Sequence, residues 1–436
     1  MDRSSPIAAM TLVEKVIARA AGRAAVRPGE ILTAQIDFAF AHDSSGPRRW
    51  RPYLEDMGVG LWDPSRVALV SDHYVPAVDA ESAAILNDAR AFARQYGVGA
   101  FFDMVGICHL VLPEHGLIRP GHFIAGGDSH TPMAGAFGAY AAGYGATDMA
   151  AIVATGETWL SVPETVRVDW SGAFQPGVVA KDIMLFLCRE LGLDNAFAAI
   201  EYAGSTVAAM SMPERMVLAN MAAELGFETG VVAPDQVTFD YLAARHAPVE
   251  DEAAALALRS DADCAYRAVH RFDAAALAPQ IARPNAPDNV APADELGEVT
   301  IDQAYIGACV GAKLGDLRMA AEVLQGRKVA PGVRLLIAPA SSATTEQAAR
   351  EGILASLLEA GAVLLPSGCG ACAGMGAGLL AAGEVCISST NRNFRGRMGH
   401  KDAEVYLGSP YSVAAAAVAG RIVDPRLLLA ERKVAA

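Results

Sequence analysis

The sequence predicts an α/β protein built on mainly parallel sheets, with two or three domains in its 436 residues. Alanine and glycine dominate a composition that is 53% hydrophobic, which suits helices packed closely on sheets. Beyond residue 298 the patterns alternate as in a doubly wound sheet. They predict strands at 303–307, 333–338 and 362–365, a helix at 316–325 and helices within 344–359.

The N-terminal two thirds give a less regular series of elements. Thr11 and Glu14 form a capping-box pattern that predicts the start of a helix. Helices are expected at 11–22, 82–96, 181–192 and 213–226, strands at 31–40 and 164–172, a strand followed by loop and turn at 99–116, and a glycine-rich loop leading into a close-packed helix at 126–156. Residues 275–298, rich in Ala, Pro, Asn and Asp, are the best candidate for a linker.

Charge and cysteine content exclude some classes of function. The formal net charge of −14 disfavours a general binder of nucleic acid or anionic membranes. No apolar stretch reaches the roughly 18 residues of a membrane span, and the acidic N-terminal region argues against a signal peptide. Seven cysteines without disulfide-like spacing fit a reducing compartment, so we expect a cytoplasmic protein.

Three cysteines in the last third carry most of the chemical information. Cys309, Cys369 and Cys372 lie in glycine- and alanine-rich turns, each after a short apolar run. Three thiolates are one short of a closed zinc site or a saturated cubane cluster, so they could hold an iron–sulfur cluster with one open iron. A redox CxxC pair and two small buried residues are the competing interpretations. Because parallel strands end at one edge of a sheet, we expect the cysteines to converge in space.

Three histidines follow apolar runs in the first third, namely His73 in SDH, His109 in GICH and His130 in DSH. Each alone is better explained as a structural histidine. Together, with Asp72 and Asp128 beside them, they could form proton relays. GGDSHT lacks the second glycine of a hydrolase elbow, and GACVGAK lacks the spacing of a phosphate loop.

The segment NRNFRGR at 391–397 supplies three arginines and two asparagines. It could be a solvated loop. It could equally bind carboxylates, since guanidinium groups do so in bidentate fashion.

Taken together, these segments resemble the aconitase superfamily, and within it the 3-isopropylmalate dehydratase large subunits. The resemblance spans nearly the whole chain, and its most specific parts are GDSHT, CxxC and NRNFxGR. It implies three aconitase-like α/β domains packed around an iron–sulfur cluster, without the swivelling fourth domain of the family. The expected domains are 1–165, 166–290 and 291–436, the last with the cluster cysteines.

The resemblance also implies a role for each candidate residue. Cys309, Cys369 and Cys372 would hold a [4Fe–4S] cluster. Asp72, His73, His109, Asp128, His130 and Glu224 would form the catalytic polar shell, and Ser129, Asn220, Asn391, Arg392 and Arg397 would bind substrate.

The implied activity is that of a hydro-lyase acting on a small hydroxy di- or tricarboxylic acid. The base of the family is a serine in a motif like SREH, which this sequence lacks, so a small swivel-domain partner subunit is expected. Relatives usually carry SCTNG at the first cysteine, where this chain has Ala308, Val310 and Gly311. That departure leaves the substrate open among isopropylmalate, 2-methylmalate, 2,3-dimethylmalate, maleate and homoaconitate types.

Three other functions remain as alternatives. They are a cluster-free RNA-binding or regulatory homologue, a thiol redox protein using CGAC, and a structural zinc site. The negative net charge argues against RNA, Cys309 would be unexplained in a redox protein, and zinc lacks an obvious fourth ligand.

Overall fold

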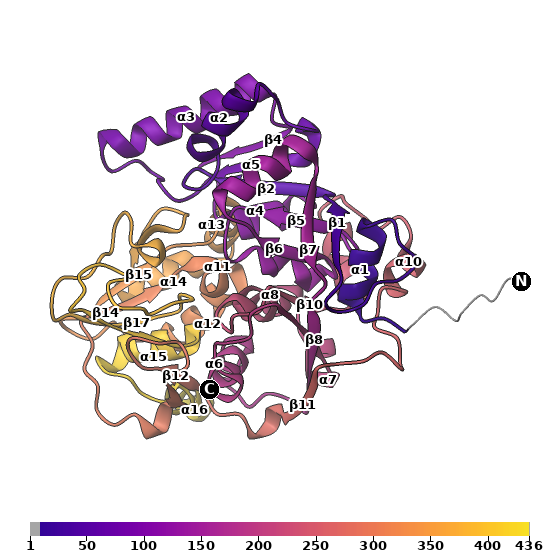
Figure 1. Ribbon diagram of the computed structural model, residues 1–436. Coiled ribbons are helices and arrows are strands. Elements are labelled where there is room, and N and C mark those ends of the chain that lie inside the picture. The colour runs from indigo at the N-terminus through magenta and orange to yellow at the C-terminus, as the bar shows by residue number, and fades with distance from the viewer. Residues whose placement is uncertain (1–8, 436) are drawn as a thin grey trace, which may run out of the picture.

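The computed structural model describes residues 9–435, and within them the strands form three larger sheets and one two-stranded ribbon (Figure 1). The sheets follow one another along the chain, and helices cover them. No helix within residues 9–435 has the length and apolarity needed to cross a membrane. The sheets covered by helices form the α/β fold that the sequence predicts.

The first sheet is wholly parallel, in the order β4-β3-β2-β5-β6. Its central strands are buried, as expected for parallel sheets covered on both faces. The strands are β2 (Phe38–His42), β3 (Val67–Ser71), β4 (Ala100–Asp103), β5 (Phe123–Gly126) and β6 (Tyr140–Gly143), and the helices of this region are α1 (Leu12–Ala20), α2 (Pro47–Met57), α3 (Ala80–Tyr96), α4 (Cys108–Glu114) and α5 (Ala146–Thr155).

The middle sheet is also parallel, in the order β10-β9-β8-β11. It comprises β8 (Glu164–Ser171), β9 (Ala198–Ala203), β10 (Thr229–Val232) and β11 (Ala268–Asp273), with α6 (Ala180–Leu191), α7 (Ser205–Ala209), α8 (Met212–Asn220), α9 (Gln236–Ala243) and α10 (Glu252–Leu256). Helix α8 matters for the site, because its buried end, at Asn220, reaches the Cys309 loop.

The third sheet is mixed, in the order β13-β12-β18-β17-β14-β15-β16. Five strands are parallel, namely β14 (Gln303–Ile306), β15 (Arg334–Ile337), β16 (Val363–Leu364), β17 (Val385–Ser388) and β18 (Glu404–Leu407). The helices are α11 (Ala308–Gly311), α12 (Leu314–Leu324), α13 (Ser342–Arg350), α14 (Ile353–Ala360), α15 (Pro410–Ala419) and α16 (Pro425–Ala435). The predicted alternation after residue 298 is confirmed.

Several predicted boundaries are confirmed by their caps. The Thr11 side chain accepts from the Glu14 N–H at 3.3 Å, and Glu14 Oε2 accepts from the Thr11 N–H at 2.6 Å, which completes the capping box of α1. Helix α3 ends at Gly97, whose φ of 66° is the left-handed conformation that glycine adopts easily.

Four local predictions are wrong, because contacts between distant segments override the local patterns. The segment 31–40 is two strands, because the chain turns at Asp37 and β1 (Ile31–Gln35) pairs antiparallel with β7 (Glu157–Ser161). The expected loop and turn after β4 contains helix α4, and the glycine-rich segment 126–156 contains strand β6. The expected linker carries β12 (Gln280–Ala282) and β13 (Val290–Pro292), a hairpin that extends the third sheet through β18.

The first and third sheets meet through the loops at their carboxyl ends. The Cys369 N–H donates to the Asp72 carbonyl at 2.8 Å, and the Ile107 N–H donates to the Ala340 carbonyl at 2.9 Å. Gly106 forms a bridge with Ser341, and its φ is 135°. The loops that carry the candidate residues are therefore joined directly by backbone hydrogen bonds.

This joint predicts that Gly106→Ala destabilises the chain. A Cβ at residue 106 would lie 2.5 Å from Ser341 Cα, in a backbone conformation that alanine rarely adopts. We expect the free energy of unfolding to fall by about 2–4 kcal/mol, measured by urea denaturation. Gly315→Ala is the matched control, because its Cβ would meet nothing within 4 Å. Equal stability of the two variants would contradict the close approach at Gly106.

Candidate functional site

The three predicted cysteines lie around one cavity of about 240 Å³. Cys309 follows β14, and Cys369 and Cys372 lie in the turn after β16. The convergence expected from the strand order is thus present. All three thiols are free within the described chain.

Most of the other predicted residues line the same cavity. Those that line it are His73, His109, Asp128, Ser129, His130, Asn391, Arg392 and Arg397. Three more lie one contact behind it: Asp72 behind His73, Glu224 behind His130, and Asn220 behind Cys309. The structure therefore brings every candidate residue to one place.

Asp72 and His73, at the end of β3, form the first carboxylate–histidine pair. His73 Nδ1 lies 2.6 Å from Asp72 Oδ1, and Asp72 Oδ2 accepts from the Cys108 N–H at 2.7 Å. Burial opposes protonation of His73, but the charge and hydrogen bond of Asp72, with Asp43 nearby, raise its pKa to about 9. His73 is therefore a cation at neutral pH, in which Nδ1–H donates to Asp72 and Nε2 carries the second proton.

Asp128 holds two histidines, His109 in the first turn of α4 and His130 in the loop after β5. His109 Nε2 lies 2.7 Å from Asp128 Oδ1, and the His130 backbone N–H donates to the same oxygen at 2.7 Å. Burial would raise the pKa of Asp128, but His109 and the hydrogen bonds hold it well below its usual range. The carboxylate stays ionised, and it fixes which nitrogen of His109 carries a proton.

Glu224 joins the middle sheet region to the arginine segment. Its Oε1 accepts from His130 Nε2 and from Arg392 Nε, both at 2.8 Å. Burial raises the pKa of Glu224, but His130 and Arg392 outweigh it and hold the pKa below its ordinary value. Arg392 is thereby positioned at the cavity with its terminal nitrogens not engaged by Glu224.

The thiols have the surroundings of metal ligands. Burial and the neighbouring Cys372 raise the pKa of Cys309 to about 12, and burial raises the pKa of Cys369 and Cys372. Because burial disfavours ionisation of these thiols, all three become thiolates only when a cationic centre lies beside them. Asn220 Nδ2–H already donates to Cys309 Sγ at 3.2 Å, the kind of donor that stabilises a thiolate.

The spacing of the thiols favours a cluster over one ion. Within the described residues, two groups have ligand atoms within 4.8 Å of one another, and both consist of histidines and carboxylates. The three cysteines do not form such a group. A single ion needs ligand atoms that lie as close together as that, whereas a cluster places each thiolate on a different iron.

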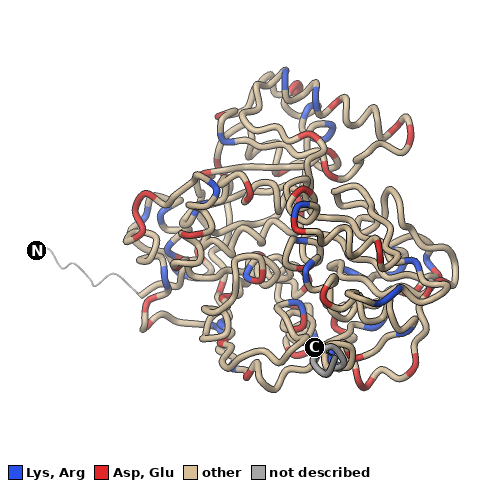
Figure 2. The backbone as a smooth tube through the Cα atoms, turned by 180° about the vertical axis from the view of Figure 1, so that it is seen from behind, with Lys and Arg blue, Asp and Glu red and all other residues tan. Residues whose placement is uncertain are grey.

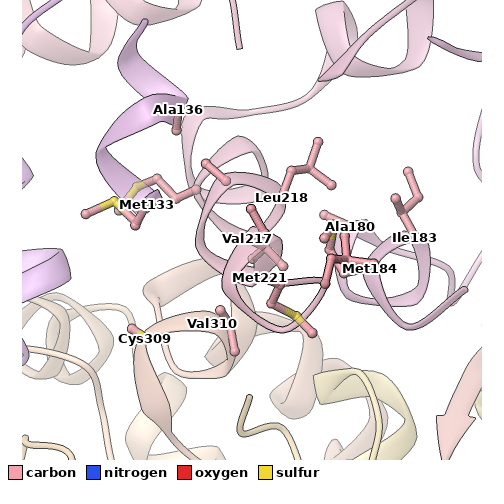
Figure 3. Close-up of a cluster of buried hydrophobic side chains, with 14 of the residues drawn as sticks. Met133, Ala136, Ala180, Ile183, Met184, Val217, Leu218, Met221, Cys309 and Val310 are labelled. Carbon is pink, nitrogen blue, oxygen red and sulfur yellow. The ribbon is translucent and has the colours of Figure 1, made fainter. Parts of the chain in front are cut away.

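The unusual residues beside Cys309 have a structural explanation. Val310 belongs to a buried apolar cluster with Val217 and Met221 of the middle region (Figure 3). A Cβ at Gly311 would lie 2.2 Å from Ser389 Oγ, which itself accepts from the Gly307 N–H at 3.0 Å. An apolar residue at 310 and a glycine at 311 thus match their surroundings. Apolar packing and the close approach of Ser389 hold the segment around Cys309, with no polar side chain at 310 or 311.

Sequence reasoning missed His42, the last residue of β2, and Asp43 and Ser44, which follow it. Ser44 lines the cavity, His42 Nε2 lies 3.3 Å from Asp128 Oδ2, and Asp43 accepts from the backbone N–H groups of His73 and Tyr74. A signal was present, since FAFAHD ends an apolar run in a histidine and a carboxylate, as SDH at 71–73 does.

A parallel-sheet fold with three cysteines, three carboxylate-held histidines and two arginines around one cavity defines an aconitase-type hydro-lyase. The chain matches the aconitase family (aconitate hydratase) over residues 33–298 and 290–420, and it belongs to that family.

Full-length relatives agree with this assignment. The chain is 46% identical to 3-isopropylmalate dehydratase large subunit 1 of Methanopyrus kandleri, over 95% of this chain and 99% of that protein. It is 44% identical to the large subunit 1 of the same name from Pyrococcus furiosus, over 95% and 98%. It is 42% identical to a probable methanogen homoaconitase large subunit of Methanothermobacter thermautotrophicus, over 96% and 98%.

The raised pKa of His73 predicts a pH dependence of stability for the metal-free chain. The folded state binds this proton more tightly than the unfolded state, whose histidine pKa is about 6.5. The contribution is about 3 kcal/mol below pH 6.5 and is lost as the pH rises to about 9. Urea denaturation at pH 6.5 and 9 should show this loss in the wild type and in the His115→Gln control, and a clearly smaller loss in His73→Gln, where only groups such as His130 with a raised pKa remain. An equal loss in all three proteins would contradict it.

Proposed function

We propose that this chain is the large, cluster-bearing subunit of a hydro-lyase that dehydrates and rehydrates a small hydroxy di- or tricarboxylic acid. The substrate class is of the 3-isopropylmalate or 2-methylmalate type. The observation that carries the proposal is the shared cavity, in which three cysteine thiols face carboxylate-held histidines and two arginines. Relatives named for isopropylmalate and for homoaconitate support the class and leave the particular acid open.

The cofactor in this proposal is a [4Fe–4S] cluster held by Cys309, Cys369 and Cys372. Such a cluster, with three thiolate ligands, supplies a Lewis-acidic iron that makes a hydroxyl a better leaving group. Asn220 donates to Cys309 Sγ and receives a hydrogen bond from Asn391 Nδ2 at 2.7 Å, so the two amides support this cysteine as a pair.

The protein's own residues divide the remaining work. His73 is the proton donor to the departing hydroxyl, because it is charged at neutral pH and lines the cavity. Asp128 orients His109, whose Nδ1 is buried without a protein partner in the described chain and so is free for substrate. Arg392 and Arg397 bind substrate carboxylates, with Ser129 as a further polar contact.

A second subunit completes the site. Removing a proton from carbon needs a base, which we assign to a serine on a small swivel-domain partner. The relatives named as large subunits support this assembly. We expect the two subunits to assemble as a heterodimer or a multiple of it. Neither nucleic acid nor a membrane is expected as a partner.

We further propose three domains, 1–165, 166–290 and 291–436, and a cytoplasmic location. The three larger sheets support this division, except that β12 precedes residue 291 and joins the third sheet. That pairing favours a second boundary near residue 280. The free cysteines of the described chain support a reducing compartment.

The rival functions have less support. A redox CxxC needs a lowered thiol pKa, whereas burial raises the pKa of both Cys369 and Cys372. A single zinc ion needs ligand atoms that lie close together around it, and within the described residues no group with such spacing contains Cys309, Cys369 and Cys372. Figure 2 shows acidic and basic residues interspersed along the described chain, which does not favour an RNA-binding stripe.

Anaerobic reconstitution with iron and sulfide tests the proposal. The wild type should bind about four irons per chain and turn brown, and Cys369→Ser should lose most of that iron. Cys264→Ser is the control, because Cys264 does not line the cavity. A colourless protein with stoichiometric zinc would overturn the cofactor.

The reconstituted chain should interconvert hydroxy di- or tricarboxylic acids and their unsaturated products only when a small subunit is added. A panel of isopropylmalate, 2-methylmalate and homoaconitate substrates would identify the acid by its kcat/KM. Turnover by the chain alone, as fast as with a partner, would contradict the two-subunit proposal.

A further inference from the structure

His42 is the last residue of β2, and β2 pairs with β3 on one side and with β5 on the other. Its side chain is 5% exposed and lies between the Asp72–His73 pair after β3 and Asp128 after β5. No other candidate residue contacts both of these groups through one ring. At this position one side chain can orient both the Asp72–His73 pair and Asp128.

On one side, the His42 ring stacks on His73. The ring centroids are 3.8 Å apart, and the planes differ by 14°. The hydrogen bond from His73 to Asp72 fixes one ring nitrogen but leaves the ring free to turn about that bond. The stacked ring of His42 prevents this rotation, so Nε2 of His73 keeps one direction.

On the other side, His42 faces the oxygen of Asp128 that the other histidines leave open. The Ser44 N–H donates to His42 Nδ1 at 3.3 Å, so the ring proton lies on Nε2. Nε2 is 3.3 Å from Asp128 Oδ2, whereas His109 Nε2 and the His130 N–H both use Oδ1. With both oxygens held, the carboxylate cannot rotate.

We propose that His42 is a positioning residue of the hydro-lyase site, fixing the ring plane of His73 by stacking and the carboxylate of Asp128 by its Nε2–H. The inference rests on the proposed function for its effect on catalysis. The two contacts are separable, because phenylalanine keeps a flat ring without the donor, and glutamine keeps an N–H donor without the ring.

Ring-nitrogen NMR of the metal-free chain, labelled with ¹⁵N-histidine, tests the positioning directly. His42→Phe should shift the His109 signals and leave those of His73 nearly unchanged. His42→Gln should do the reverse. His115→Phe, at an exposed histidine outside the cavity, is the control and should shift neither. Unchanged His73 and His109 signals in both His42 variants would overturn the proposal.

Kinetics of the reconstituted two-subunit enzyme test the consequence. Each His42 variant should lower kcat by about 10–100-fold with little change in KM, while iron content stays at the wild-type level. A KM increase without loss of kcat, or loss of the fold or of iron in both variants, would assign His42 a merely structural role. If the wild-type assembly has no hydro-lyase activity, the proposed function fails, and the NMR result still decides whether His42 positions these groups.

Discussion

Asp72 is the residue on which the site depends, because it joins the two sheets that build it. Its carbonyl accepts from the Cys369 N–H, so the third sheet's cysteine turn is fixed to the first sheet. Its carboxylate accepts from the Cys108 N–H and holds His73. One fully buried residue therefore sets the distance between a thiol and the proposed proton donor. Catalytic groups on two sheets act together only if such a joint is rigid.

Much of this arrangement could be predicted from the sequence. Strands of a parallel sheet end at one edge, so short apolar runs followed by Cys309, Cys369 and DSH predict which residues meet. Helix boundaries with strong caps, such as Thr11 and Gly97, depend on neighbouring residues and were equally predictable. These features share one property: the physical cause lies within a few residues of the effect.

The remainder depends on contacts between distant segments. The chain from 31 to 40 divides because β1 pairs with residues 157–161, which no local pattern shows. His42 gains its surroundings only when β2 lies between β3 and β5. Val310 and Gly311 depart from the family pattern, and only their neighbours, the apolar end of α8 and Ser389, explain why these residue types fit. In each case tertiary packing decides what local propensity leaves open.

We propose that the three thiolates would hold a cluster with an open iron, which would bind the substrate's hydroxyl. Mössbauer spectroscopy of the chain reconstituted with ⁵⁷Fe, together with its partner subunit, tests it most directly. The account predicts that adding the hydroxy acid changes the signal of one iron in four and leaves the other three unchanged. A spectrum that substrate does not alter, or one in which all the irons change alike, would contradict it.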